Sequence, residues 1–183
     1  MKEYTSDIAF TDTVKNIQKQ EGSRDIYAHM EQRGGWEDRV TKQLADFIAQ
    51  RDSFYMATVN GEGQPYIQHR GGPRGFLKVL DDKTLGFADF SGNRQYISYG
   101  NLVDNNKVCL FLMDYPNRKR IKVWGTAEVI TGDDILNKQL TTSAYKATPE
   151  RAFIIHVTAW DINCPKHITP RYTVEEIKAL NLE

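Results

Sequence analysis

The most informative polar residues of this sequence lie where predicted strands end. In the segment 68–72, His69 and Arg70 precede the paired glycines Gly71 and Gly72. Glycine lets a backbone approach a flat ligand closely because no Cβ intervenes. Arginine presents a planar fork of donors to phosphate or carbonyl oxygens. The pattern is typical of a ligand-binding loop; the alternative is a glycine-rich loop with an ordinary surface arginine.

A second segment, 89–95, is a small polar loop that leads into a predicted short helix. Asn93, Arg94 and Gln95 stand beside the start of that helix. The free N–H groups and the positive end of a helix attract phosphate, and Arg94 would add a charge-assisted hydrogen bond. The sequence therefore predicts a phosphate site here. The alternative is an asparagine helix cap beside a solvated arginine.

A third segment, 117–125, is basic. As a strand it places Arg118, Arg120 and Lys122 on one face, where they could meet an anion. A solvated strand face is the commoner outcome for such a run. A nucleic-acid patch is a further alternative, but the stacking aromatics of an RNP-like pattern are missing. Lys+Arg and Asp+Glu both number 24, so the formal net charge is zero and no nucleic-acid partner is expected.

A fourth segment, 160–168, begins with Trp160 and continues through a turn that contains Pro165 and His167. Such a turn could line a ligand pocket, and a core tryptophan with a structured turn is the alternative. Cys164 has no base beside it in sequence. No nucleophile elbow, G-x-G-x-x-G, Walker loop or H-E-x-x-H occurs, so neither a catalytic residue nor a metal site is predicted.

These segments need a scaffold, and the rest of the sequence predicts a single domain, 1–183, that is mainly β with an N-terminal helical segment over about 1–50. Thr11 or Asp12 is expected to cap a first helix that Gly22 ends. A second, amphipathic helix is predicted from the helical spacing of apolar residues over 40–48, with Glu37 and Asp38 in its first turn.

The β region consists of short runs joined by tight turns. Strands are predicted over 53–59, 64–70, 76–80, 84–90, 108–115, 120–130 and 152–160. Asn60–Gly63 is a strong hairpin signal. Further helices are expected within 131–149 and over 173–180, the second with Thr173 as its cap. Short antiparallel strands in this number favour a barrel or a sandwich.

Composition limits the location and the class of protein. Hydrophobic residues make up 40% and charged residues 26% of the 183, as in ordinary globular proteins. The two cysteines show neither disulfide-framework nor metal-ligand spacing. No apolar stretch approaches the roughly 20 residues of a membrane span, so a cytoplasmic protein without membrane contact is expected.

Taken together, five segments resemble the pyridoxamine 5'-phosphate oxidase-like, FMN-binding split-barrel flavoproteins. They are 52–59, 68–73, 75–80, 92–98 and 112–118. The resemblance implies a six-stranded antiparallel split barrel with flanking helices. It also implies a homodimer with FMN at the subunit interface, each site drawing residues from both chains.

The resemblance also implies a set of cofactor-binding residues. The flavin-contacting segment of the family maps onto His69, Arg70, Gly71 and Gly72, and the phosphate-holding segment onto Asn93, Arg94 and Gln95. Backbone contacts are expected at Ala88 and Asp89, and a side-chain contact at Arg120. The tail 160–168 also resembles one branch of the family, and Trp160 is counted among the cofactor-binding residues. Gln95 stands where many members have lysine, so Arg70 or Lys78 is expected to support the phosphate.

The departures from the family pattern bear on function. The C-terminal Arg-x-His motif of true pyridoxamine phosphate oxidases is replaced by 167–171, and 131–149 lacks their substrate-phosphate set, so vitamin B6 oxidation is not expected. The expected function is that of an FMN-dependent oxidoreductase supplied by a separate reductase or electron donor. The alternative is a non-catalytic carrier or sensor of a flavin, a deazaflavin or haem.

Overall fold

The computed structural model describes residues 4–141, 145–162 and 165–180. Its helices are η1 (Thr5–Ile8), α1 (Asp12–Gln20), α2 (Arg24–Gln32), α3 (Lys42–Ala49), α4 (Ile97–Asp104), α5 (Asp134–Leu140) and α6 (Val174–Ala179). Its strands are β1 (Ser53–Val59), β2 (Pro65–Gly71), β3 (Lys78–Val79), β4 (Thr84–Phe90), β5 (Lys107–Asp114), β6 (Lys119–Thr131) and β7 (Pro149–Ile162). Among the helices in the described ranges, none has the length and apolar character needed to cross a bilayer.

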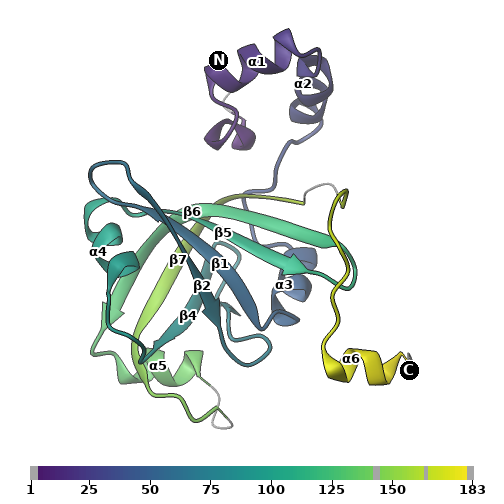
Figure 1. Cartoon of the computed structure of the whole chain (residues 1–183). Helices are drawn as coiled ribbons and strands as arrows, with labels where there is room; N and C mark the ends of the chain where they lie inside the picture. Colours follow the sequence, from purple (N-terminus) through teal and green to yellow (C-terminus); the bar gives the residue numbers. More distant parts are fainter. Residues whose placement is uncertain (1–3, 142–144, 163–164, 181–183) are drawn as a thin grey trace.

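The strands form one antiparallel sheet in the order β2-β1-β5-β6-β7-β4-β3 (Figure 1). Among the described residues the sheet has seven strands and does not close on itself, so the expectation of six strands is wrong. The additional member is the short β3, which pairs with β4 only through Lys78 and Val79. The mainly β architecture with flanking helices is confirmed.

Strict alternation of side chains gives the sheet an inner and an outer face. The inner face carries the core, built from Phe54 and Met56 of β1, Leu110 and Leu112 of β5, Val123 of β6, Phe87 of β4 and Phe153 of β7, among others. Leu44 and Ile48 of α3 belong to the same cluster. A smaller cluster of Ala88, Leu140, Ala152 and Ile154 lies where α5 packs on β4 and β7.

The long strands β6 and β7 change register between Trp124 and Gly125. A Cβ at Gly125 would collide with the carbonyl oxygen of His156 on β7. Only glycine lets the two backbones approach this closely at the irregularity. Gly125 is therefore required by the close approach of β6 and β7 and not by a ligand.

Several predicted elements differ in extent. Phe76 and Leu77 are core residues before β3, so the predicted strand 76–80 is mostly wrong. Within 131–149 the described helix is only α5. Helix α3 starts after the cap Thr41, whose hydroxyl accepts from Leu44 N, and not at Glu37, which pairs with Trp160 instead. Caps at Thr11 and Thr173 are confirmed, and Gly22 follows α1 at φ +73°.

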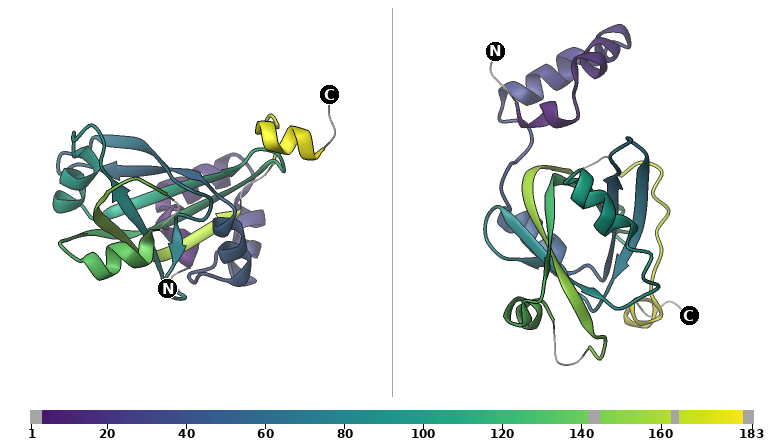
Figure 2. Two further views of the ribbon diagram at one scale, coloured as in Figure 1. Left: turned by 90° about the horizontal axis from the view of Figure 1, so that it is seen from below. Right: turned by 90° about the vertical axis from the view of Figure 1, so that its left-hand side faces the viewer.

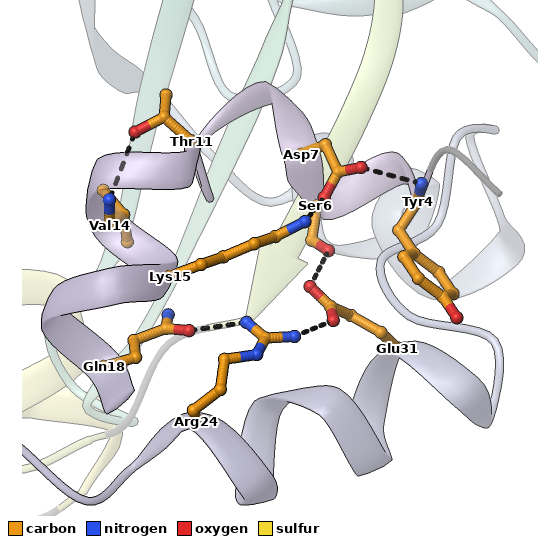
Figure 3. Close-up of polar contacts among 9 residues, drawn as sticks. All are labelled: Tyr4, Ser6, Asp7, Thr11, Val14, Lys15, Gln18, Arg24 and Glu31. Atoms are coloured by element: carbon orange, nitrogen blue, oxygen red, sulfur yellow. Dashed lines mark hydrogen bonds and ion pairs between the residues drawn. The ribbon is translucent and has the colours of Figure 1, made fainter. Parts of the chain in front are cut away.

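The N-terminal helices η1, α1 and α2 form a small unit beside the sheet (Figures 1 and 2). Within 4–43 the buried residues are Ser6, Gln18 and Glu31, all polar. Arg24 of α2 joins two of them, because its guanidinium donates to the Gln18 amide and to the Glu31 carboxylate, which also accepts from Ser6 Oγ (Figure 3). The unit is therefore organised around an ion-pair network.

Aromatic rings connect this unit to the sheet. Phe10 packs against Tyr27 and Trp36, and Trp36 stacks on Trp124 of β6 with ring centroids 4.7 Å apart. Gly34 and Gly35, at φ +120° and +68°, form the bend that brings Trp36 to this position.

Candidate functional site

The candidate site is a groove between β2 and β4, where the two ends of the sheet approach each other. No backbone ladder joins these strands among the described residues. The groove is lined by Tyr66, Gln68 and Arg70 of β2, by Asp89 of β4, by Glu150 and Phe153 of β7, and by the loop and first turn 92–99. Three strands and one helix start therefore contribute to one hollow.

Charged side chains on the inner face cross this opening. Arg70 Nη1 donates to Asp89 Oδ1 at 2.6 Å. Asp89 is the cross-strand neighbour of Arg151 on β7, whose Nε lies 3.4 Å from Asp89 Oδ2. Arg151 also donates to Glu150 at 2.5 Å. The groove thus has a fixed polar wall of alternating charge.

Burial governs the electrostatics of this wall. The side chains of Arg70 and Asp89 are only 12% and 17% exposed. Burial lowers the pKa of Arg70 and raises the pKa of Asp89, and the attraction between the two groups opposes both shifts. Arg70 Nε is also buried without a hydrogen-bond acceptor among the described residues. A buried N–H without a partner is costly, so this atom marks a place where a ligand oxygen would be stabilising.

The loop that enters α4 forms the opposite wall. Arg94 and Tyr96 adopt φ +59° and +55°, a conformation that costs non-glycine residues on the order of 1 kcal/mol and clusters at functional loops. Asn93 accepts from Gln95 N at 3.3 Å. Helix α4 starts after Tyr96 with no side-chain cap, so asparagine does not cap this helix. The N-terminal donors of α4 therefore remain available to an anion.

The charges around the groove leave one arginine unmatched. Arg70 and Arg94 line the groove with Asp89 and Glu150, and Arg151 pairs with both acids. In the part of the chain that the structure describes, Arg94 has no acidic partner. Arg151 lies over the rings of Tyr96 and Tyr99, with its Cζ 4.8 and 5.3 Å from their centroids. This stacking holds one edge of the exposed loop against β7. The arrangement suits a ligand with an anionic group and a flat body.

The structure brings together five of the predicted site residues and separates the others. Arg70, Asp89, Asn93, Arg94 and Gln95 line the groove. His69 points to the outer face and packs edge-on against Tyr55, with ring centroids 5.6 Å apart. A Cβ on Gly72 would lie 2.7 Å from the ring of Phe76, so the fold itself requires this glycine. Gly71 follows at the exposed end of β2.

Four predicted residues lie away from the groove. Lys78 lines a separate hollow beside α3, and Ala88 is buried against α5. Trp160 is 4% exposed in the barrel core, and its indole donates to the Arg39 carbonyl at 2.7 Å. Arg120 lies on the outer face of β6, with its Nε buried and unpaired in the described structure. Arg118 belongs to the turn before β6 and does not share that face.

Sequence reasoning missed Arg151, Glu150 and the tyrosines Tyr96 and Tyr99. The predicted strand over 152–160 began one residue too late to include Arg151. The alternation of side chains along β7 could have identified Arg151. This residue stands two positions before Phe153 and therefore shares the inner face with it. The contribution of Tyr66 and Gln68 follows in the same way from alternation with Arg70.

The outer face of the sheet is a second notable surface. One cross-strand row consists of His69, Tyr55, Phe111, Lys122 and Asp161, and the next of Ile67, Ala57, Cys109, Trp124 and Ala159. Ile67 and Tyr55 are 66% and 39% exposed. Exposed apolar side chains on a broad sheet are typical of a protein–protein interface.

Comparisons with known proteins agree with this architecture. The family model described as "Pyridoxamine 5'-phosphate oxidase" matches residues 40–164. No curated protein matches the sequence. HupZ of Group A Streptococcus superposes with a TM-score of 0.54 at 23% identity, covering 72% of this chain and 98% of its own.

Two further solved structures share the fold. An FMN-binding protein from Syntrophomonas wolfei superposes with a TM-score of 0.55 at 14% identity, covering 80% of this chain and 97% of its own. A protein of Clostridium acetobutylicum related to general stress protein 26 gives 0.50 at 17%, with 72% and 92% covered. These likenesses concern the fold alone. Because the family model spans more than half of the sequence, the chain belongs to the pyridoxamine 5'-phosphate oxidase family.

Proposed function

We propose that the protein is an FMN-binding oxidoreductase that holds the cofactor phosphate at the start of α4. The observation that carries the proposal is the pairing of Arg94, which has no acidic partner among the described residues, with an uncapped helix start on the wall of one groove. Phosphate is the anion that such a helix end and an arginine bind together.

Other residues that line the groove also support the proposal. Arg70 lines the groove wall opposite the phosphate loop, and its buried Nε has no acceptor in the described structure. Tyr66, Tyr96 and Phe153 supply apolar surface for a flat ring system. Bound FMN would supply reversible electron transfer, while the protein supplies orientation and charge. Arg70, Asn93, Arg94 and Gln95 are the residues proposed to hold it.

The working form is proposed to be a homodimer built on the outer face of β2, β1, β5 and β6. Its exposed Ile67 supports this surface as the contact, and the neighbouring row carries His69 and Lys122. Arg120 lies on the same face with a buried Nε that lacks an acceptor in the described chain. In the proposed dimer, Arg120 and His69 would contact the second subunit. Electrons are proposed to come from a separate reductase or donor.

The test is the absorbance spectrum of the protein purified without added cofactor, with mass spectrometry of what boiling releases. Two flavin bands and the mass of FMN are expected, together with bleaching by dithionite or a nicotinamide nucleotide and recovery in air. A deazaflavin band or a Soret band would instead favour the carrier alternative. A colourless protein that also refuses added FMN would overturn the proposal.

A further inference from the structure

A second cavity, of about 440 Å³, lies beneath the C-terminal segment and away from the flavin groove. Its barrel side is formed by the start of β1, the end of β5 and the turn 115–117. Its other side is formed by Arg171, Tyr172, Thr173 and Glu176, which lead into α6. The volume falls within the roughly 300–1,000 Å³ that small-molecule sites occupy.

The floor of this cavity is a buried, rigid polar cluster. Arg51 donates to the Met113 carbonyl at 3.0 Å and lies 3.5 Å from Asp114. Asp114 also accepts from the backbone N–H and the side-chain amide of Asn117, at 3.0 to 3.2 Å. The side chains of Arg51 and Asp114 are 16% and 9% exposed. The charges of Arg51 and Asp114 are therefore already paired with each other within the protein.

The remaining acids of the cavity are also engaged. Glu176 accepts from Thr173 N at 2.8 Å and so completes the capping box of α6. Asp52 accepts from Ser53 Oγ at 3.0 Å. By contrast, Arg74 and Arg171 line the same cavity without an acidic partner among the described residues. These two guanidiniums are the unmatched charges of the site.

Aromatic rings also line the cavity. The Arg171 guanidinium lies over the Tyr115 ring, 4.9 Å from its centroid, which fixes its position. Tyr55 and Tyr172 line the same cavity and are 39% and 42% exposed. Partly exposed tyrosines present flat apolar faces at little cost in side-chain entropy.

We infer that this cavity binds a small aromatic anion, whose carboxylate or phosphate is held by Arg74 and Arg171 and whose ring packs among Tyr55, Tyr115 and Tyr172. Guanidinium groups recognise both acids through paired hydrogen bonds. The cavity also adjoins the flavin-side strand, because Phe54 in its wall lies opposite Arg70 in the β1–β2 register. The inference concerns binding alone and does not depend on the cofactor.

The experiment is isothermal titration of the full chain with benzoate and, separately, with phenyl phosphate. Saturable one-site binding of at least one probe is expected, and the stronger of the two identifies the acid group. Arg74→Gln and Arg171→Gln should each weaken it on the order of tenfold or more, because each removes a charged donor. Arg39→Gln removes an exposed arginine that pairs with Asp82 outside the cavity and should change nothing. Both test arginines are exposed, so the fold should persist.

FMN titration of the same variants separates this inference from the proposed cofactor site. FMN affinity should stay within about twofold of the parent protein, because neither arginine lines the flavin groove. Absence of binding by both probes, or equal binding by parent and variants, would overturn the inference. So would variants that lose FMN while keeping the probes, since the arginines would then belong to the cofactor.

Discussion

Arg70 on β2 donates to Asp89 on β4 across 2.6 Å, and this contact links two strands that share no backbone ladder in the described structure. The sheet runs from β2 through five other strands before its far edge is reached. An ion pair therefore spans the split of the barrel at the point where the candidate cofactor groove opens. The same contact contributes to the fold and shapes the site.

Removal of the acid in this pair should destabilise the protein strongly. Asp89→Ala leaves the Arg70 guanidinium, 12% exposed, without its carboxylate. An uncompensated buried charge of this kind costs about 3 kcal/mol. Urea unfolding should show a lower midpoint with an unchanged slope.

A matched control is the exposed pair between Arg39 and Asp82, whose side chains are 60% and 58% exposed. Asp82→Ala should leave the urea midpoint nearly unchanged because water screens this pair. Equal losses of stability in the two variants would show that the Arg70–Asp89 contact stabilises the fold no more than an exposed ion pair does.

The N-terminal unit should respond separately to loss of its buried carboxylate. Glu31→Ala leaves Arg24 and Ser6 Oγ without their shared acceptor (Figure 3), at a cost of about 2 kcal/mol. Hydrogen exchange should accelerate at amides of α1 and α2 while β5 and β6 keep their protection. Glu21→Ala, an exposed change just after α1, serves as the control. Uniform loss of protection across the barrel would contradict a local network.

The same unit should depend on pH through Asp7. The hydrogen bond from Lys15, at 2.6 Å, lowers the pKa of Asp7 below its usual 3.8, and burial opposes it only in part. A carboxyl whose pKa is lower in the folded state adds stability above its unfolded pKa and loses it as the pH falls through the folded value.

The parent protein should therefore lose helical protection in this unit below about pH 4. Asp7→Asn should be less stable than the parent at pH 6, and the gap should close as the pH falls. Hydrogen exchange at α1 or fluorescence of the Trp36–Trp124 stack can follow both proteins. A gap that is the same at pH 6 and pH 3 would rule out the Asp7–Lys15 pair as its source.

The outer sheet face should control assembly if the proposed homodimer is correct. Ile67→Glu places a charge on a side chain that is 66% exposed on this face. Light scattering after size exclusion should then report a monomer where the parent is a dimer. Val103→Glu on α4, at 75% exposure, is the matched control and should leave the dimer intact. A monomeric parent protein, or dimers in both variants, would show that this surface is not the contact between subunits.

Local patterns in the sequence predicted much of the fold. Caps at Thr11 and Thr173 and the hairpin at Asn60–Gly63 depend on neighbouring residues alone, so short segments were enough to find them. The prediction of a strand over 76–80 was mostly wrong because the apolar residues Phe76 and Leu77 pack in the core without belonging to a strand. Burial and strand formation favour the same residue types there.

The candidate site was predictable only in part, for a related reason. The loop around Arg94 is contiguous in sequence and was found directly. Arg151 reaches the groove through its register with Asp89 on a strand more than 60 residues away, and no local pattern carries that pairing. Trp160 shows the converse case, since an aromatic residue at a strand end serves the core equally well, and this one is buried.

The measurement that tests the central claim most directly is FMN titration of the cofactor-free protein and of Arg94→Ala, followed by flavin fluorescence. Loss of one charged hydrogen bond to the phosphate should weaken binding by roughly 1.5–3 kcal/mol, or about 10- to 150-fold. Arg33→Ala, an exposed arginine after α2, should bind FMN as the parent does. Unchanged FMN affinity in Arg94→Ala would contradict the assignment of the phosphate to the start of α4.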